Sequence, residues 1–236
     1  MAERHALLVI ADIGGYTRFM RLHRMSLAHA QENTARLLGA VIDAAPELQL
    51  VALEGDGAFL CAADGAALRL GELGVAMHRA FHAEQQRMYS VNLCVCDGCA
   101  QTGQLTVKFV AHVGEVVEQR LKHGTTLAGL DVILVHRMLK NSVPVPKYIL
   151  MTEAVLSELV PAFRERAEAI EEELEGLGRQ QLWFVDVSAI ASDLPPAAPA
   201  PWSERIGYAA RLTARTLPRM LGVTRPLGRR QEARPL

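Results

Sequence analysis

The sequence lacks any long uninterrupted apolar segment, although half of its 236 residues are hydrophobic. The first apolar run, residues 6–10, is ended by Ala11 and Asp12, too early for a signal peptide or a membrane span. No later stretch approaches the roughly 20 apolar residues that a membrane-spanning helix needs. We therefore expect a soluble, cytoplasmic protein whose apolar residues form the core of one domain with an appendage.

The sequence also lacks a strong excess of charge of one sign. Its formal net charge is −1, so the composition contains no general signal for a nucleic-acid partner. Lysine occurs only four times, at positions 108, 122, 140 and 147, and arginine supplies the other basic residues, which we attribute to codon usage. Cysteine is equally scarce, with four residues in all, so a disulfide framework is not expected.

Three of the four cysteines form a cluster, Cys94, Cys96 and Cys99. Three thiolates within six residues can bind one Zn²⁺ if a fourth ligand comes from elsewhere. The sequence offers four residues for that role, Cys61, His78, His82 and His112. The alternatives are three ordinary reduced thiols or a redox switch, and all three interpretations stay open.

The hydrophobic pattern predicts strands and helices in alternation, interrupted by hairpins. Residues 7–13 are typical of a strand buried on both faces. Residues 48–53 and 58–62 flank Glu-Gly-Asp-Gly at 54–57, which indicates a β-hairpin. Further strands are predicted at 105–113, 147–151, 168–174 and 180–187, and residues 115–121 either extend the first of these or pair with it. Helices are predicted at 16–24, 66–88, 131–139 and 153–159. Another helix is predicted to start after Ser26 and stop at Pro46. The pattern favours an α+β fold with helices packed on a mixed, mainly antiparallel sheet over a doubly wound sheet.

The composition changes near residue 193. Residues 1–190 form the predicted domain, 191–201 a linker rich in Pro and Ala, and 202–236 an arginine-rich tail. The tail has eight arginines and two glutamates, a formal charge of +6, so the rest of the chain carries −7. Pro218 and the later Gly and Pro residues weaken the case for a long helix. For the tail we favour docking on the acidic domain or disorder over contact with an anionic membrane.

Two aspartates lie where strands are predicted to end. Asp12 closes a buried strand, where a carboxylate is costly without a partner. Glycines and a helix start follow it, and the free N–H groups there can bind phosphate; these residues are Gly14, Gly15, Tyr16 and Thr17. Asp56 lies in the predicted hairpin turn, so the two carboxylates together can bind Mg²⁺ or Mn²⁺. The alternative is that Asp12 caps a helix and Asp56 forms a turn.

The segment Ala-Asp-Ile-Gly-Gly-Tyr-Thr-Arg-Phe at 11–19 resembles the metal-binding strand and phosphate loop of class III adenylate and guanylate cyclase domains. Asp56 lies where that family has its second metal aspartate. Later segments resemble further family segments in the right order, namely 112–116, 129–138, and 174–177 with 183–187, so the resemblance covers about residues 6–188. The Cys94–Cys99 cluster and residues 136–141 also resemble a divergent, uncharacterised bacterial subgroup of this superfamily.

The resemblance implies a nucleotidyl-cyclase (ferredoxin-like) sandwich and roles for individual residues. Asp12 and Asp56, with the Ile13 carbonyl, would bind the divalent metal. Asp131 would contact the purine of a nucleoside triphosphate, and Arg137 would stabilise charge on the phosphate under attack. Family members usually pair antiparallel and share their sites, so a homodimer is implied.

Two positions depart from the family pattern. Ala52 stands where cyclases have a base-selecting lysine, and Ile133 stands where they have a transition-state asparagine. Loss of such a polar group costs about one to several orders of magnitude in rate. Two functions therefore stay open: a metal- and nucleotide-binding cyclase domain that forms a cyclic nucleotide, or a non-catalytic sensor or scaffold that retains the fold.

Overall fold

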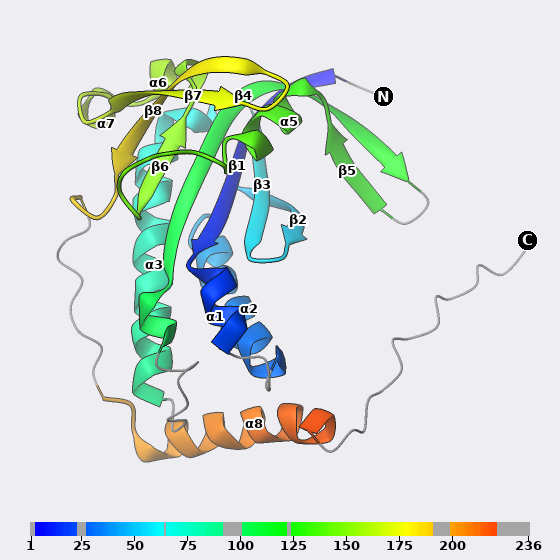
Figure 1. Ribbon diagram of the computed structural model, residues 1–236, viewed down its shortest axis with the longest axis vertical. Helices are drawn as coiled ribbons and strands as arrows, with labels where there is room; N and C mark the ends of the chain where they lie inside the picture. Colours follow the sequence, from blue (N-terminus) through cyan, green and yellow to red (C-terminus); the bar gives the residue numbers. More distant parts are fainter. Residues whose placement is uncertain are drawn as a thin grey trace, which may run out of the picture.

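The computed structural model describes residues 3–22, 27–63, 65–91, 101–121, 124–190 and 199–220. Its centre is one mixed sheet in which the strands follow the order β2-β3-β1-β4-β6-β8-β7, with β5 paired to β4 (Figure 1). Among the strand pairs of the described residues, β4 and β6 run parallel and the others are antiparallel, which confirms the predicted fold class. The strands are β1 (Glu3–Gly14), β2 (Gln49–Glu54), β3 (Gly57–Ala63), β4 (Thr106–Leu121), β5 (Gly124–Ala128), β6 (Tyr148–Met151), β7 (Glu168–Leu174) and β8 (Gly178–Asp186).

The helices pack on both faces of this sheet. One face is covered by α2 (Leu27–Asp43) and α3 (Leu70–Val91), which follow the short α1 (Tyr16–Leu22) and a 3₁₀ turn (Ala66–Arg69) respectively. The other face is contacted by α5 (Leu130–Arg137). The remaining helices are α6 (Glu153–Glu158), α7 (Pro161–Arg164) and α8 (Trp202–Met220). Among the described helices, none combines the length and the apolar character needed to span a bilayer.

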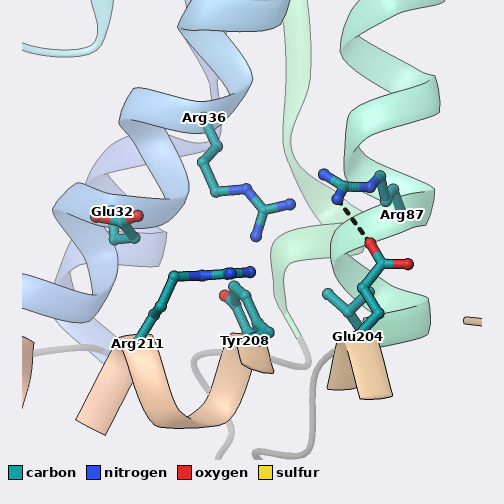
Figure 2. A pocket seen from close by; sticks show the side chains of 7 residues that line it. Glu32, Arg36, Arg87, Glu204, Tyr208 and Arg211 are labelled. Carbon is teal, nitrogen blue, oxygen red and sulfur yellow. Dashed lines mark hydrogen bonds and ion pairs between the residues drawn. The ribbon is translucent and has the colours of Figure 1, made fainter. Parts of the chain in front are cut away.

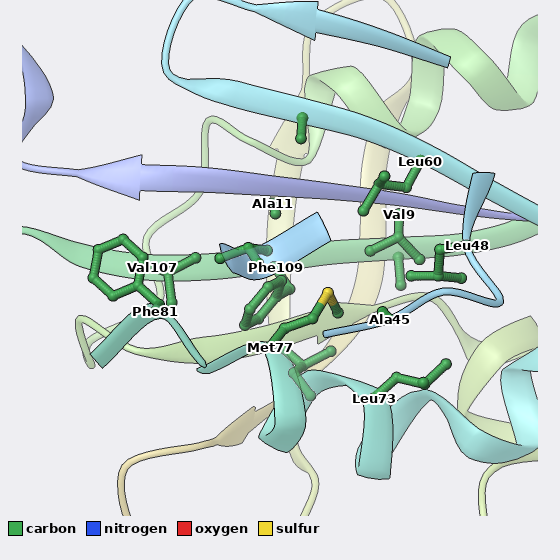
Figure 3. Close-up of a cluster of buried hydrophobic side chains, with 14 of the residues drawn as sticks. Val9, Ala11, Ala45, Leu48, Leu60, Leu73, Met77, Phe81, Val107 and Phe109 are labelled. Atoms are coloured by element: carbon green, nitrogen blue, oxygen red, sulfur yellow. The ribbon is translucent and has the colours of Figure 1, made fainter. Parts of the chain in front are cut away.

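Strand β1 separates two hydrophobic cores. Successive side chains of a strand point to opposite faces, so Val9 and Ala11 pack toward α2 and α3, where they meet Met77, Phe81 and Phe109 (Figure 3). The alternate residues of β1 pack on the other face against β3, β4 and α5, and these are Ala6, Leu8 and Ile10. The continuous apolar run read from the sequence is explained by this burial on both faces.

Several elements differ in detail from their predicted form. Residues 115–121 extend β4; residues 115–117 still pair with β1, and 117–121 pair with the unpredicted strand β5. Thr152 occupies the N-cap position of α6 but makes no side-chain capping bond; instead its Oγ1 lies 2.9 Å from Nδ1 of His112. The short helix α7 was also missed, because its single turn is too short to produce a helical pattern in the sequence.

The arginine-rich tail contains a 19-residue helix, α8, which continues to Met220. The expectation that Pro218 argues against a long helix was wrong, because this proline lies in the last turn, where its missing N–H removes a single intrahelical bond. Helix α8 lies across one end of the molecule and contacts α2 and α3 (Figure 1). The first part of the linker, 191–198, lies outside the described residues.

The core facing α3 should dominate stability. Phe109 is fully buried at its centre, so Phe109→Ala should destabilise the protein by about 3–5 kcal/mol and lower the midpoint of thermal unfolding by at least about 6 °C. Leu68→Ala, at an exposed position, should change the free energy of unfolding by less than about 0.5 kcal/mol. Equal midpoints for the two variants would contradict this assignment of the core.

Candidate metal and nucleotide site

The structure brings the two predicted metal aspartates together at one end of the sheet. Asp12 lies near the end of β1, in register with Gly57 on β3. The hairpin turn before Gly57 carries Asp56, whose carbonyl oxygen accepts a hydrogen bond of 3.2 Å from the backbone N–H of Ile13. A Cβ atom at Gly57 would lie 3.7 Å from Asp12 Oδ1, so the turn passes directly beside that carboxylate.

The electrostatic state of Asp56 reflects this crowding. Burial raises the pKa of Asp56 above its usual value of 3.8, and the nearby Asp12 carboxylate raises it further. A hydrogen bond to the backbone and the Lys108 ammonium lower the pKa, but they do not cancel the rise. Ionised Asp56 is therefore destabilised by its surroundings, as expected of a carboxylate placed to receive a cation.

Lys108 is a site residue that sequence reasoning missed. It lies opposite Asp12 on β4, and its Nζ is 3.3 Å from Asp12 Oδ2, with both side chains about one-fifth exposed. The same Nζ lies 3.4 Å from the Leu139 carbonyl oxygen, to which it donates. The signal was a lysine between apolar residues in the first part of β4, which required a partner on the neighbouring strand.

A second set of polar contacts holds the chain that follows α5 in place. The Tyr148 hydroxyl donates a 2.8 Å hydrogen bond to Asn141 Oδ1, and Asn141 Nδ2 donates to the Met138 carbonyl at 2.7 Å. Burial raises the pKa of Tyr148, which therefore stays protonated as a donor. These bonds hold the segment that supplies the Leu139 carbonyl to Lys108.

The predicted phosphate-binding residues form a tight turn into α1. Gly15 has φ of +84°, a conformation that favours glycine, and its carbonyl accepts the N–H of Phe19 at 3.1 Å. Tyr16 begins the helix, and its hydroxyl accepts a 3.1 Å bond from Gln31; Thr17 follows it in the first turn. A cavity of about 120 Å³ lies beside this turn, lined by Gly15, Arg18, Phe19, Gln101, Gln104 and Leu105.

Asp131, the predicted purine contact, is engaged with the sheet. Its Oδ2 accepts a 2.6 Å hydrogen bond from the backbone N–H of Glu115. A Cβ atom at Gly114 would collide with the same carboxylate, so this glycine permits the close approach of α5. Oδ1 lies 3.1 Å from His112 Nε2. Burial lowers the pKa of His112 and outweighs the opposing effect of Asp131, so this histidine is neutral at pH 7.

Arg137 and His136 face a different cavity. Arg137 Nη1 lies 2.6 Å from Glu175 Oε2, and no ion pair joins it to Asp12 or Asp56 among the described residues. His136 donates from Nδ1 to the Val132 carbonyl at 2.7 Å, and its Nε2 lies 3.1 Å from Glu54 Oε2. A cavity of about 290 Å³ is lined by Val132, Ile133, His136, Arg137 and Lys140.

The donor set at Asp12 and Asp56 fits a hard divalent cation. Mg²⁺ is usually held by one or two carboxylates together with substrate phosphates, and two carboxylates and the Ile13 carbonyl supply oxygen atoms only. The described part of the chain contains no group of three or more His, Cys, Asp or Glu residues able to hold a metal by themselves. Cys94, Cys96 and Cys99 lie outside the described residues, so the zinc interpretation stays a prediction.

Comparison by sequence finds relatives without an assigned reaction. A family model described as a protein of unknown function (DUF2652) matches residues 34–148. The chain is 42% identical over 166 residues to a protein of Mycobacterium tuberculosis described as uncharacterized protein Rv2561/Rv2562. That match covers 70% of this chain and 77% of the relative.

Comparison by structure finds the class III cyclase fold. The guanylate cyclase domain of RhGC from Catenaria anguillulae, solved with GTP, gives a TM-score of 0.57 at 14% identity over 78% of this chain and 98% of that one. The adenylyl cyclase CyaB from Pseudomonas aeruginosa gives 0.52 at 14% identity over 78% and 95%. A class III adenylyl cyclase-like ATP-binding protein from Pseudomonas aeruginosa gives 0.55 at 16% identity over 70% and 36%.

The raised pKa of Asp56 predicts a pH-dependent effect on stability. Because the folded state binds this proton more tightly than the unfolded state, ionisation of Asp56 opposes folding; the cost is absent below pH 3.8 and grows as the pH rises through the folded pKa. Asp56→Asn should therefore raise the thermal midpoint at pH 7. Since the carboxylate is partly exposed, we expect a gain of less than about 1 kcal/mol and a midpoint shift of at most about 4 °C.

The control for this measurement is Glu3→Gln at an exposed strand end. Thermal unfolding of both variants and the wild type should be followed at pH 7 and below pH 3.8. The gain of Asp56→Asn should shrink at the lower pH, whereas Glu3→Gln should change little at pH 7. A loss of stability in Asp56→Asn at pH 7 would contradict the electrostatic assignment.

Proposed function

The chain belongs to the protein family of the mycobacterial relative Rv2561/Rv2562, and we propose that it binds a nucleoside triphosphate together with Mg²⁺ or Mn²⁺. The observation that supports this most directly is the pair of carboxylates on Asp12 and Asp56. They approach each other at neighbouring strand ends, and burial together with the nearby Asp12 carboxylate raises the pKa of Asp56. A divalent cation relieves such repulsion, and the fold is that of nucleotide cyclases.

Asp12, Asp56 and the Ile13 carbonyl would hold the metal. A bound Mg²⁺ or Mn²⁺ neutralises phosphate charge and polarises the phosphoryl group. Lys108 already supplies one positive charge to Asp12, so the two carboxylates and this ammonium carry a net charge of −1. Metal alone should consequently bind weakly, and the triphosphate must supply further negative charge and oxygen ligands. Binding of metal and nucleotide is therefore coupled.

The base should be bound with little selectivity. Ala52 and Ile133 offer no hydrogen-bond donor or acceptor, and Asp131 is held by the backbone N–H of Glu115. Phosphate, in contrast, would meet free N–H groups at the turn into α1 of this chain and cationic groups supplied by a partner copy. Gly14, Gly15, Tyr16 and Thr17 form the turn into α1, and Lys140 lines the cavity beside Arg137. Affinity should come mainly from the triphosphate and metal.

Two modes of action follow from this site. In the first, a cyclase, the ribose 3′-hydroxyl loses its proton to solvent water and its oxygen forms a bond to the α-phosphorus. Pyrophosphate leaves with the electron pair of the broken phosphorus–oxygen bond, and Arg137 stabilises the developing charge. In the second, a nucleotide sensor, binding occurs without turnover. The exposed apolar Ile133 and the engagement of Arg137 with Glu175 favour the sensor, and one protein of this fold is described as an ATP-binding protein.

Calorimetry and product analysis test this proposal. The wild type, titrated with Mn²⁺, ATP or GTP singly and with each nucleotide plus Mn²⁺, should bind tightly only when metal and nucleotide are both present. Asp12→Asn and Asp56→Asn should each weaken that binding at least tenfold, whereas Glu3→Gln should not. Undiminished binding in both aspartate variants would overturn the metal site. Chromatography of the same mixtures distinguishes the modes, because a cyclic product identifies the cyclase and its absence with intact binding identifies the sensor.

A homodimer that completes the site is part of the proposal, because Arg137 has no contact with the metal aspartates of its own chain. Leu53, Leu130 and Ile133 are exposed apolar residues of β2 and α5, and a partner would cover them. Light scattering at micromolar concentration should give a dimer mass, and Leu130→Glu should give a monomer that has lost nucleotide turnover or affinity. Leu68→Glu, also at an exposed apolar position, is the control. A monomeric wild type would contradict the shared site.

A further inference from the structure

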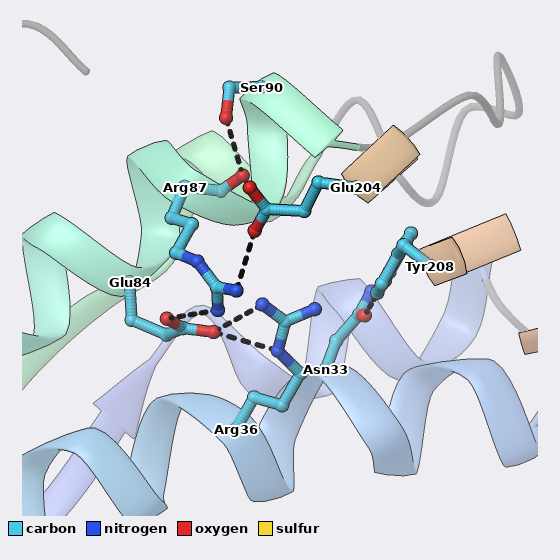
Figure 4. A network of polar contacts seen from close by, with 7 residues as sticks. All are labelled: Asn33, Arg36, Glu84, Arg87, Ser90, Glu204 and Tyr208. Atoms are coloured by element: carbon cyan, nitrogen blue, oxygen red, sulfur yellow. Dashed lines mark hydrogen bonds and ion pairs between the residues drawn. The ribbon is translucent and has the colours of Figure 1, made fainter. Parts of the chain in front are cut away.

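Helix α8 is fixed to the body of the protein by its polar side. Glu204 Oε1 lies 2.6 Å from Arg87 Nη2 on α3, and Arg87 also contacts Glu84 at 3.5 Å. The Tyr208 hydroxyl donates a 3.2 Å hydrogen bond to Asn33 Oδ1 on α2, and both residues are buried. Figure 4 shows these contacts joining the three helices. Together they set the rotation of α8 about its own axis.

Charged side chains also line the space between α8 and the body. A cavity of about 230 Å³ is bounded by Glu32, Arg36, Arg87, Val91, Glu204, Tyr208 and Arg211. Figure 2 shows the guanidinium groups of Arg36, Arg87 and Arg211 directed into it from three different helices. The Arg36 guanidinium carbon lies 5.0 Å from the centre of the Tyr208 ring. The side of α8 that faces the body is therefore predominantly polar.

The opposite side of α8 presents apolar residues to solvent. Trp202, Ile206 and Leu217 are 67%, 60% and 47% exposed. At about 100° per residue these three positions lie within about 60° of arc, so they form one stripe. An amphipathic helix on a globular protein normally buries its apolar side. Because the polar contacts orient α8 the other way, the stripe remains available for an external partner.

Charge indicates which partner fits this stripe. Residues 202–236 contain eight arginines and two glutamates, a formal charge of +6. A second copy of the chain docked stripe to stripe would bring two such segments together, and their repulsion opposes self-association. An anionic lipid surface attracts the same charge, and Trp, Ile and Leu enter the boundary between headgroups and acyl chains. The Arg205 guanidinium lies 4.7 Å from the Trp202 ring, which places a cation beside the stripe.

We propose that α8 is an interfacial helix that attaches this protein to anionic membranes through Trp202, Ile206 and Leu217. The sequence favoured docking on the acidic body or disorder over membrane contact, as if docking and membrane contact were exclusive. In the structure they use opposite sides of one helix, so the helix can contact the body and lie flat on a bilayer together. Its position across one end of the molecule leaves most of the sheet away from that surface (Figure 1).

Vesicle sedimentation tests this attachment with the full chain. Vesicles of phosphatidylcholine with one-quarter phosphatidylglycerol should bind the protein at 0.1 M salt, and vesicles of phosphatidylcholine alone should bind at least tenfold less. Raising the salt to 0.5 M should weaken binding, because screening reduces the charge attraction. Ile206→Ser and Trp202→Ser should each reduce binding at least threefold, while the thermal midpoint stays that of the wild type.

Leu68→Ser provides the matched control, because Leu68 is apolar and similarly exposed but lies outside α8. It should bind vesicles as the wild type does. Equal binding by Ile206→Ser and Leu68→Ser would overturn the proposal, since attraction would then depend on charge without the stripe. A lipid-free wild type whose mass by light scattering falls upon Ile206→Ser would also overturn it, because a second copy would then cover the stripe.

Discussion

The burial of β1 on both faces is the constraint on which the rest of the structure depends. A strand enclosed by β3 and β4 in the sheet, and by helices above and below it, must be apolar along its length. A carboxylate is tolerated only where the strand ends, and there Asp12 meets the hairpin that carries Asp56 and the ammonium of Lys108. The same geometry that closes the core therefore concentrates charge at one end of the sheet, where we propose that a cation and an anionic ligand bind together.

Helix α5 shows how the residues around that site are held. Its Asp131 accepts a hydrogen bond from the backbone of β4, next to Gly114. Its His136 contacts Glu54 at the end of β2, and its Arg137 pairs with Glu175. Two of these groups, Asp131 and Arg137, are the ones that the cyclase resemblance would assign to nucleotide. The pairs of His136 and Arg137 are exposed, and exposed ion pairs contribute little to stability, so a ligand can replace Glu54 or Glu175 at small cost. The hydrogen bond from the Glu115 N–H to Asp131 is different, because it depends on the close approach of α5 that Gly114 permits.

Charge is divided along the chain, and the division has a structural consequence. The body carries a formal charge of −7 and residues 202–236 carry +6. Part of that attraction is realised where Arg87 and Glu204 join α3 to α8, with Glu84 contacting both Arg36 and Arg87. These local pairs orient the helix, and the orientation turns an apolar stripe outward. The aspartate site at the end of β1 and the apolar stripe on α8 thus share one feature. In each case ion pairs within the protein engage some side chains and leave their neighbours accessible to a ligand or a surface.

The sequence by itself determined the fold class, most of the strands and helices, and the positions of Asp12 and Asp56 at strand ends, because hydrophobic period and turn residues are local signals. Local signals could not reveal Lys108 as the partner of Asp12, since strand register between residues 96 positions apart depends on the whole sheet. They also could not show that Asp131 would be bound to Glu115 or that Thr152 would contact His112 and leave its helix uncapped. Which side of α8 faces the body was decided only by tertiary structure. The helical period identifies an apolar side but does not indicate what that side contacts, and here long-range polar contacts turn the polar side toward the body.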